Sequence, residues 1–327
     1  MKECFDNHHS VQGGCMQSRR SDEYQMINHR RQFQRAKIAL AFSGIKEKID
    51  QARNAGKVIL YLPGSYDLVH EGHDWYHKES IIHYITTERK TRSEIYVVIL
   101  ADSESLVSVV KRNKWKPMGG TEEFRRPVQR LEAFSDCLGF DDSCAGIDPR
   151  LIDLSTFEVD MVGIIPGPLE MDYTVIPPAM AWKHLETDFE SFVSGHPMMP
   201  LNHVQKMKKI LREFPWLTQN FLQTPEVIKS DFRTELDAVT PELCAVHWRI
   251  QTWQLLIHSY LASGEFNAPF VRIMSNHDAD YHFEIEFLMS LCGITMRYFT
   301  DRKIITTTEL LGKNGRDRLL KAKRSYY

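Results

Sequence analysis

The chain has 327 residues, of which 43% are hydrophobic and 26% are charged, a composition typical of a folded globular protein. Its 41 basic and 43 acidic side chains nearly cancel, so overall charge favours neither nucleic acid nor an anionic membrane as a partner. No apolar run approaches the roughly 20 residues that a membrane-spanning helix needs. The six cysteines form no C-x-x-C pair, so we expect reduced thiols and a cytoplasmic protein without a zinc ribbon.

Residues 1–55 divide into a polar arm and a first helix. The opening MKECFDNHHS has no hydrophobic segment of the kind that forms a secretory signal. Residues 31–54 are rich in Gln, Arg, Lys and Ala, and their apolar side chains have helical spacing. These side chains are Ile38, Leu40, Phe42 and Ile45. We therefore expect a helix over 31–54 that packs in front of the first strand.

Short runs of branched apolar residues, bounded by glycine or proline, predict buried strands of a parallel sheet. The runs are 57–62, 94–100, 270–274 and 295–299. Helical periodicity predicts helices at 71–85, 103–112, 122–138 and 281–291, and a last helix near Thr308. This alternation indicates an α/β protein with a Rossmann-like doubly wound parallel sheet.

Residues 151–268 interrupt this alternation and contain four of the six tryptophans. Amphipathic patterns at 201–218 and 241–262 predict two long helices in this segment. We therefore expect the first half of the sheet domain at 56–150, a large, mainly helical insertion at 151–268, and the second half of the domain at 269–327.

A polar, glycine-containing motif follows the first predicted strand directly. It reads Gly64-Ser65-Tyr66-Asp67-Leu68-Val69-His70-Glu71-Gly72-His73. The motif lies where a strand passes into a helix, at the carboxyl edge of the sheet, where open α/β folds bind ligands. Glycines at its two ends allow a tight turn and a close approach of a nucleotide to the backbone.

The two histidines of this motif carry the chemical argument. His70 and His73 are three residues apart, so they share one face at a helix start. The free N–H groups and partial positive charge of a helix N-terminus favour phosphate, and two imidazoles beside it can donate hydrogen bonds. We therefore interpret this segment as a site for a nucleoside triphosphate. The alternative is a pair of surface histidines on an ordinary helix.

GSYDLVHEGH resembles the G-T-F-D-x-x-H-x-G-H signature of the cytidylyltransferases, which belong to the H-x-G-H nucleotidyltransferase superfamily. The segment Ile305–Leu311 is similar to the family's I-S-T-T-E-L-I signature, which binds the β and γ phosphates at a second helix N-terminus. The turn Asp102–Glu104 and the segment Thr121–Arg126 are similar to the family's S-D-E and E-E-R segments. The family's G-G-D is replaced by residues 275–280.

The resemblance implies an enzyme that joins NMP from an NTP to a small phosphorylated acceptor and releases pyrophosphate. It implies CTP as the favoured nucleotide and Mg²⁺ as the cofactor, with no metal site built from protein ligands alone. The residues implied in catalysis are His70, His73, Lys111 and Arg125. The residues implied in nucleotide binding are Gly64, Ser65, Tyr66, Asp67, Gly72, Thr306, Thr307 and Thr308.

Two other functions stay open at this point. The chain resembles the ATP-using adenylyltransferases of the same superfamily as well, since the motif does not select the base. It also fits a catalytically silent nucleotide-binding module, with residues 151–268 as a partner surface. In the enzyme, this insertion either covers the acceptor or forms an assembly surface, for which a homodimer is one arrangement.

Overall fold

The computed structural model describes residues 34–66, 69, 71–107, 147–175, 185–205, 207–209, 211–212, 226–227, 229–230, 232–233, 253–254, 256–275 and 282–299. All of them belong to one unit of the chain, Gln34–Thr306.

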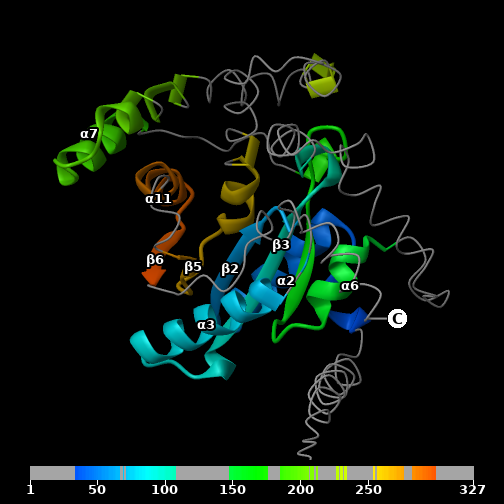
Figure 1. The fold of residues 1–327 in the computed structure, drawn as a ribbon. Coiled ribbons are helices and arrows are strands. Elements are labelled where there is room, and N and C mark those ends of the chain that lie inside the picture. The colour runs from blue at the N-terminus through cyan, green and yellow to red at the C-terminus, as the bar shows by residue number, and fades with distance from the viewer. Residues whose placement is uncertain are drawn as a thin grey trace, which may run out of the picture. The chain divides into compact units, whose positions relative to one another are not determined.

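Six strands form a single sheet in the order β1-β4-β3-β2-β5-β6 (Figure 1). Every pair of neighbouring strands is parallel. The strands are β1 Ile38–Ala39, β2 Val58–Gly64, β3 Ile95–Asp102, β4 Met161–Ile165, β5 Phe270–Ser275 and β6 Thr295–Phe299. This sheet confirms the predicted Rossmann-like doubly wound fold, and β2, β3, β5 and β6 match the four apolar runs of the sequence.

Helices connect the strands. The α-helices with described bounds are α2 Phe42–Asn54, α3 Glu71–Thr87, α6 Pro149–Ser155, α7 Leu185–Gly195 and α11 His282–Leu291. Short 3-10 turns are η1 Arg35–Lys37, η2 Arg92–Glu94 and η6 Tyr173–Val175. Helical conformation also occurs at 104–107, 201–205, 207–209, 211–212, 253–254 and 256–262. Helices α3 and α11 confirm two predictions, whereas the helices expected at 122–138 and near Thr308 lie outside the described residues.

Both faces of the sheet are buried, which explains the unbroken apolar runs in the sequence. In β2, each side chain from Val58 to Leu62 is at most 4% exposed. One face, which includes Tyr61 and Phe270, packs with apolar residues of α2, α11 and the helix at 256–262. Helices α3 and α6 cover the other face (Figure 1), where the Tyr76 hydroxyl of α3 donates to the backbone oxygen of Ile273 in β5.

Glycines end the two helices that lead into β2 and β6. Gly56 and Gly293 adopt positive φ angles of 75° and 71°, which favour glycine. After α2, the Lys57 N–H donates to Ala52 O at 3.0 Å, and after α11 the Ile294 N–H donates to Met289 O at 2.9 Å. These six-residue closures are Schellman motifs, which satisfy the last helical carbonyls.

The expectation of one helix over 31–54 is wrong in its first part. Residues Arg35–Lys37 form a 3-10 turn, and Ile38 and Ala39 form β1, which pairs with Val162 and Gly163 of β4. The helix begins only at Phe42. A strand of two residues has no periodicity of its own, so its pairing with a distant strand decided the conformation.

The expected boundary of the insertion at residue 151 is also wrong, because the sheet extends beyond it. Strand β4 at Met161–Ile165 pairs with β3 over five residues, from Val98–Met161 to Asp102–Ile165. Its sequence is short and contains Gly163, which gives no strong strand signal. The residues described at 256–262 pack on the same sheet, with Ile257 and Leu261 fully buried in the main core.

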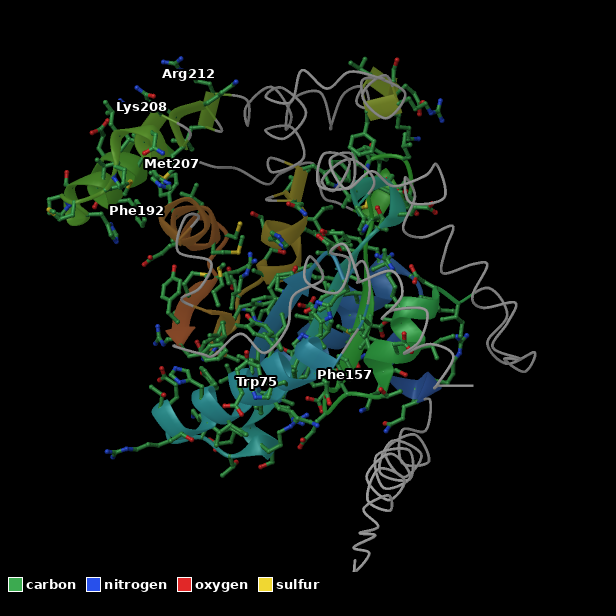
Figure 2. The ribbon with its side chains drawn as sticks, in the orientation of Figure 1. Trp75, Phe157, Phe192, Met207, Lys208 and Arg212 are labelled. Atoms are coloured by element: carbon green, nitrogen blue, oxygen red, sulfur yellow. The ribbon has the colours of Figure 1, made fainter. Side chains whose placement is uncertain are left out.

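Helical structure is found where the insertion was predicted to be helical. Phe189 and Phe192 of α7 contact the ring of Phe287 in α11, at centroid distances of 5.5 and 5.0 Å. In the helical residues after 200, Met207 is fully buried, whereas Lys208 and Arg212 are exposed (Figure 2). Leu201, the apolar residue with which the predicted amphipathic pattern at 201–218 begins, is 70% exposed.

Replacing Gly163 by alanine is expected to lower the free energy of unfolding by about 1–3 kcal/mol, because the new methyl group overpacks the core. A Cβ atom at Gly163 would lie 2.7 Å from Ile45 Cδ1 and 3.2 Å from Leu100 Cδ2, and both side chains are buried. The control is Gly44→Ala in α2, where no atom lies within 4 Å of the new Cβ. That change should stabilise by about 0.5–1 kcal/mol. Equal denaturation midpoints for the two variants would contradict this packing.

Candidate functional site

The carboxyl edge of the sheet has a topological switch point beside β2. From β2 the chain continues to β3 and β4 on one side, whereas β5 pairs with the opposite side of β2. The loops that leave β2 and β5 therefore diverge, and open α/β sheets bind ligands in the crevice between such loops. Gly64, the last residue of β2, lies at this edge. The predicted phosphate-binding motif begins at Gly64, so its start borders the switch point.

Tyr66 anchors the turn after β2. Its φ angle is 41°, an uncommon conformation for a residue with a side chain. The side chain is 6% exposed, and its hydroxyl donates to Leu62 O at 2.9 Å. Gly64 makes room for it, because a Cβ atom there would lie 3.1 Å from the tyrosine ring. The side chain of Tyr66 is therefore buried, so only the backbone of this residue is in a position to bind a ligand.

His73 lies in the first turn of α3, which begins at Glu71. Its ring meets the ring of Tyr66 edge-on, at a centroid distance of 5.2 Å. The side chain is partly exposed, and Gly72 precedes it in the same turn. An imidazole at this position adds a hydrogen-bond donor to the partial positive charge of the helix N-terminus.

His77 stands one turn further along α3 and is 1% exposed. Its Nε2 atom lies 2.8 Å from the Tyr66 hydroxyl oxygen. Because the tyrosine hydrogen is donated to Leu62 O, His77 Nε2 carries the hydrogen of this contact and Nδ1 is unprotonated. Nδ1 is buried and has no hydrogen-bond partner, and burial lowers the pKa of His77 to about 3. The ring is therefore neutral at physiological pH and supports Tyr66.

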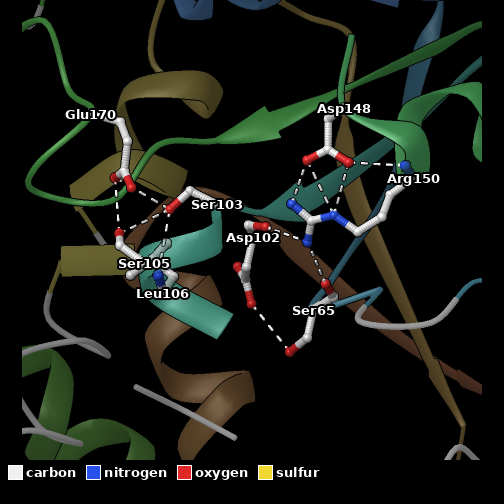
Figure 3. Close-up of polar contacts among 8 residues, drawn as sticks. All are labelled: Ser65, Asp102, Ser103, Ser105, Leu106, Asp148, Arg150 and Glu170. Atoms are coloured by element: carbon white, nitrogen blue, oxygen red, sulfur yellow. Dashed lines mark hydrogen bonds and ion pairs between the residues drawn. The ribbon is translucent and has the colours of Figure 1, made fainter. Parts of the chain in front are cut away.

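A buried carboxylate lies at the end of β3, next to the turn. Asp102 is 5% exposed, and its Oδ2 atom accepts a long hydrogen bond of 3.3 Å from the Ser65 hydroxyl (Figure 3). The Gln254 amide donates to its other oxygen, Oδ1, at 3.1 Å. Asp102 therefore connects the turn after β2 to the helical residues at 253–254. The Ser65 hydroxyl hydrogen faces this carboxylate, so the turn presents backbone N–H groups more readily than this hydroxyl.

A second polar cluster connects the ends of β3 and β4. The carboxylate oxygen Oε2 of Glu170 accepts hydrogen bonds from Ser103 at 3.3 Å and from Ser105 at 2.9 Å (Figure 3). Both serines are buried, whereas Glu170 is exposed. Gly167 completes the cluster, because a Cβ atom there would overlap the oxygens of Ser105 and Glu170, at 2.3 and 2.6 Å.

Seven of the residues predicted from the sequence lie outside the described part of the chain. They are Asp67, His70, Lys111, Arg125, Thr306, Thr307 and Thr308. The structure brings Gly64, Ser65 and Tyr66 together with Gly72 and His73 of α3, through the contact between the Tyr66 and His73 rings. The roles of the seven remain predictions.

Three polar residues at this edge were not predicted from the sequence as site residues: Asp102 and Arg150, which are buried, and Gln254, which is partly buried. Asp102 belongs to a turn that resembles a family segment, but nothing in the sequence joins it to Ser65. The one local signal near Arg150 is Asp148-Pro149, which caps α6: the Asp148 carboxylate accepts from the Arg150 N–H at 2.9 Å. Gln254 had no signal at all.

Within the described ranges, no three His, Cys, Asp or Glu residues come close enough to hold a metal ion. A search of the same residues for a helix with the length and apolar character of a membrane span finds none.

Comparison of the chain with protein-family models, with curated proteins and with solved structures finds no match. Functional inference therefore depends on the residues and geometry of this chain.

Proposed function

We propose that this protein is a nucleotidyltransferase, which transfers NMP from an NTP, with CTP favoured, to a small phosphorylated acceptor. The observation that supports the proposal is the position of His73 in the first turn of α3. Helix α3 starts directly after the loop from β2, beside the switch point, and has Gly72 and His73 in its first turn. The partial positive charge of a helix N-terminus, together with an imidazole donor, suits the phosphates of a nucleotide.

The reaction needs positioning and charge stabilisation more than a strong base. A phosphate oxygen of the acceptor attacks the α-phosphorus in line, and the bond from that phosphorus to the β-phosphate bridging oxygen breaks. Pyrophosphate leaves with that bonding electron pair. Because the attacking phosphate is already an anion at neutral pH, no proton has to be removed from it. This agrees with a site whose histidine is a donor and whose Asp102 is occupied by Ser65 and Gln254.

In this proposal His73 stabilises charge on the phosphates. Its imidazole donates a hydrogen bond to phosphate oxygens whose charge rises in the transition state. The Tyr66 ring, which meets it edge-on, restricts where the imidazole can lie. The neutral, buried His77 contacts the Tyr66 hydroxyl and so fixes the Tyr66 ring. Through that ring, His77 positions His73, the histidine that binds the ligand in this proposal.

Mg²⁺ binds chiefly through phosphate oxygens and water, often with one or two carboxylates. When bound, it would supply neutralisation of the triphosphate charge. Both carboxylate oxygens of Asp102, at the end of β3, already accept hydrogen bonds, so we expect phosphate oxygens and water to hold the ion.

A pyrophosphate-release screen tests the proposal. Each of the four NTPs is combined with Mg²⁺ and a panel of phosphorylated alcohols, amines and sugars. We expect release of pyrophosphate that depends on Mg²⁺, on one preferred nucleotide and on one class of acceptor. Preference for ATP would indicate an adenylyltransferase. Nucleotide binding without turnover would indicate a silent binding module, and absence of binding to all four NTPs would contradict the proposal.

A further inference from the structure

Arg150 makes an unusual set of contacts at the carboxyl edge of the sheet. It is the second residue of α6, and its side chain is 1% exposed. Its Nε atom lies 3.1 and 3.2 Å from the two carboxylate oxygens of Asp148, and its Nη2 atom lies 2.7 Å from Oδ2 (Figure 3). This fork-like pairing fixes the plane of the guanidinium group.

The remaining hydrogen bonds of the Arg150 guanidinium go to two backbone oxygens. Its Nη1 atom donates to Asp102 O at 2.8 Å and to Ser65 O at 3.2 Å (Figure 3). Asp102 is the last residue of β3, and Ser65 is the first residue after β2. The ladder between these strands ends with the pair Gly64 and Ala101, so the guanidinium joins the two chains just beyond their last pairing.

This contact determines the orientation of one peptide unit in the turn. In a trans peptide the C=O and the following N–H point in opposite directions. Because Ser65 O faces Arg150, the Tyr66 N–H faces away from Arg150. No hydrogen bond in the described part of the chain uses that N–H.

We propose that Arg150 is a positioning residue, which holds the Ser65–Tyr66 peptide so that the Tyr66 N–H binds a phosphate oxygen of the ligand. The inference rests on the proposed function for the identity of the ligand. Lysine cannot replace Arg150, because an ammonium group lacks the planar fork that binds Asp148 and reaches both backbone oxygens. The side chain itself touches no ligand.

Two variants test this proposal, with inorganic triphosphate, CTP and ATP as probes in the presence of Mg²⁺. Arg150→Lys should weaken triphosphate binding by about 10-fold or more, the effect of one hydrogen bond to a charged group. The second variant carries the α-hydroxy acid of tyrosine at position 66, which turns the Ser65–Tyr66 amide into an ester. It should weaken binding to a similar degree with an unchanged denaturation midpoint, since that N–H makes no described hydrogen bond within the protein.

Arg92→Lys is the matched control. Arg92 pairs with Asp160 at 2.9 Å, and these residues precede β3 and β4 at the opposite edge of the sheet. Its replacement should leave triphosphate affinity unchanged.

A lower denaturation midpoint for Arg150→Lys with unchanged affinity would reduce Arg150 to a structural residue and overturn the proposal. Wild-type affinity in the ester variant, which does not depend on the folding of Arg150→Lys, would overturn it as well. Triphosphate binding without any turnover would contradict the proposed enzymatic activity. The comparison of triphosphate affinity between the wild-type protein and the variants would still test the role of Arg150. If the wild-type protein binds none of the probes, that result contradicts both the proposed ligand and the proposed role of Arg150.

Discussion

Replacing His73 by phenylalanine is expected to lower the rate of nucleotidyl transfer by about 10²–10³, the effect of losing one donor that stabilises transition-state charge. Phenylalanine keeps a ring that can meet Tyr66 edge-on, as His73 does at 5.2 Å, and removes both nitrogens. The denaturation midpoint should therefore change little. Single-turnover measurements of pyrophosphate release, with saturating nucleotide, separate this chemical effect from a loss of binding. His70→Ala should lower the rate to a similar extent.

His83→Phe is the matched control, since it makes the same chemical change on the same helix. His83 lies ten residues after His73, about 15 Å further along α3 at 1.5 Å per residue. Its ring contacts Phe299 at 5.6 Å, well away from the turn after β2. Full activity in His83→Phe with a large loss in His73→Phe would support the assignment. Near-normal turnover in both His70→Ala and His73→Phe would end it.

Acidification from pH 7.5 to pH 5 is expected to lower the free energy of unfolding by about 4 kcal/mol through two buried histidines. Burial lowers the pKa of His77 to about 3, and burial with the charge of Arg272 lowers the pKa of His258 to about 3. An ordinary histidine titrates near pH 6.5. As the pH falls below 6.5, the unfolded chain therefore binds two protons that the folded chain does not, which costs about 2 kcal/mol of stability per histidine at pH 5.

Variants can isolate this contribution from that of the carboxylates. His77→Gln keeps a polar group near the Nε2 atom that contacts Tyr66, and His258→Asn keeps one near the Nδ1 atom that lies 2.7 Å from the Tyr61 hydroxyl. Neither replacement titrates in this range. Urea denaturation at both pH values should show a difference smaller by about 2 kcal/mol in each variant. An unaltered difference in both variants would show that the buried rings do not cause it.

The sequence alone was sufficient where local physics decides the structure. Strands β2 and β3 are buried on both faces, so they have unbroken apolar sequences, and glycine follows α2 and α11 because the chain there needs a positive φ. The turn after β2 and the helix that starts at Glu71 were also predicted from local sequence, the turn from its glycine and the helix from its periodicity. Alternation of such segments was enough to predict a doubly wound sheet.

Tertiary structure decided the features that depend on residues far apart in the chain. Strand β1 has too few residues for a periodicity, and pairing across 124 positions, Ile38 with Val162, makes it a strand. The links from Asp102 to Ser65 and Gln254 span 37 and 152 positions. Arg150 reaches across 85 positions to Ser65, and no local pattern indicates which backbone oxygen a guanidinium will bind. The sequence thus predicted which segments bind phosphate, and packing decided which side chains hold the turn after β2 in place, because hydrogen bonds over such separations exist only once the sheet has formed.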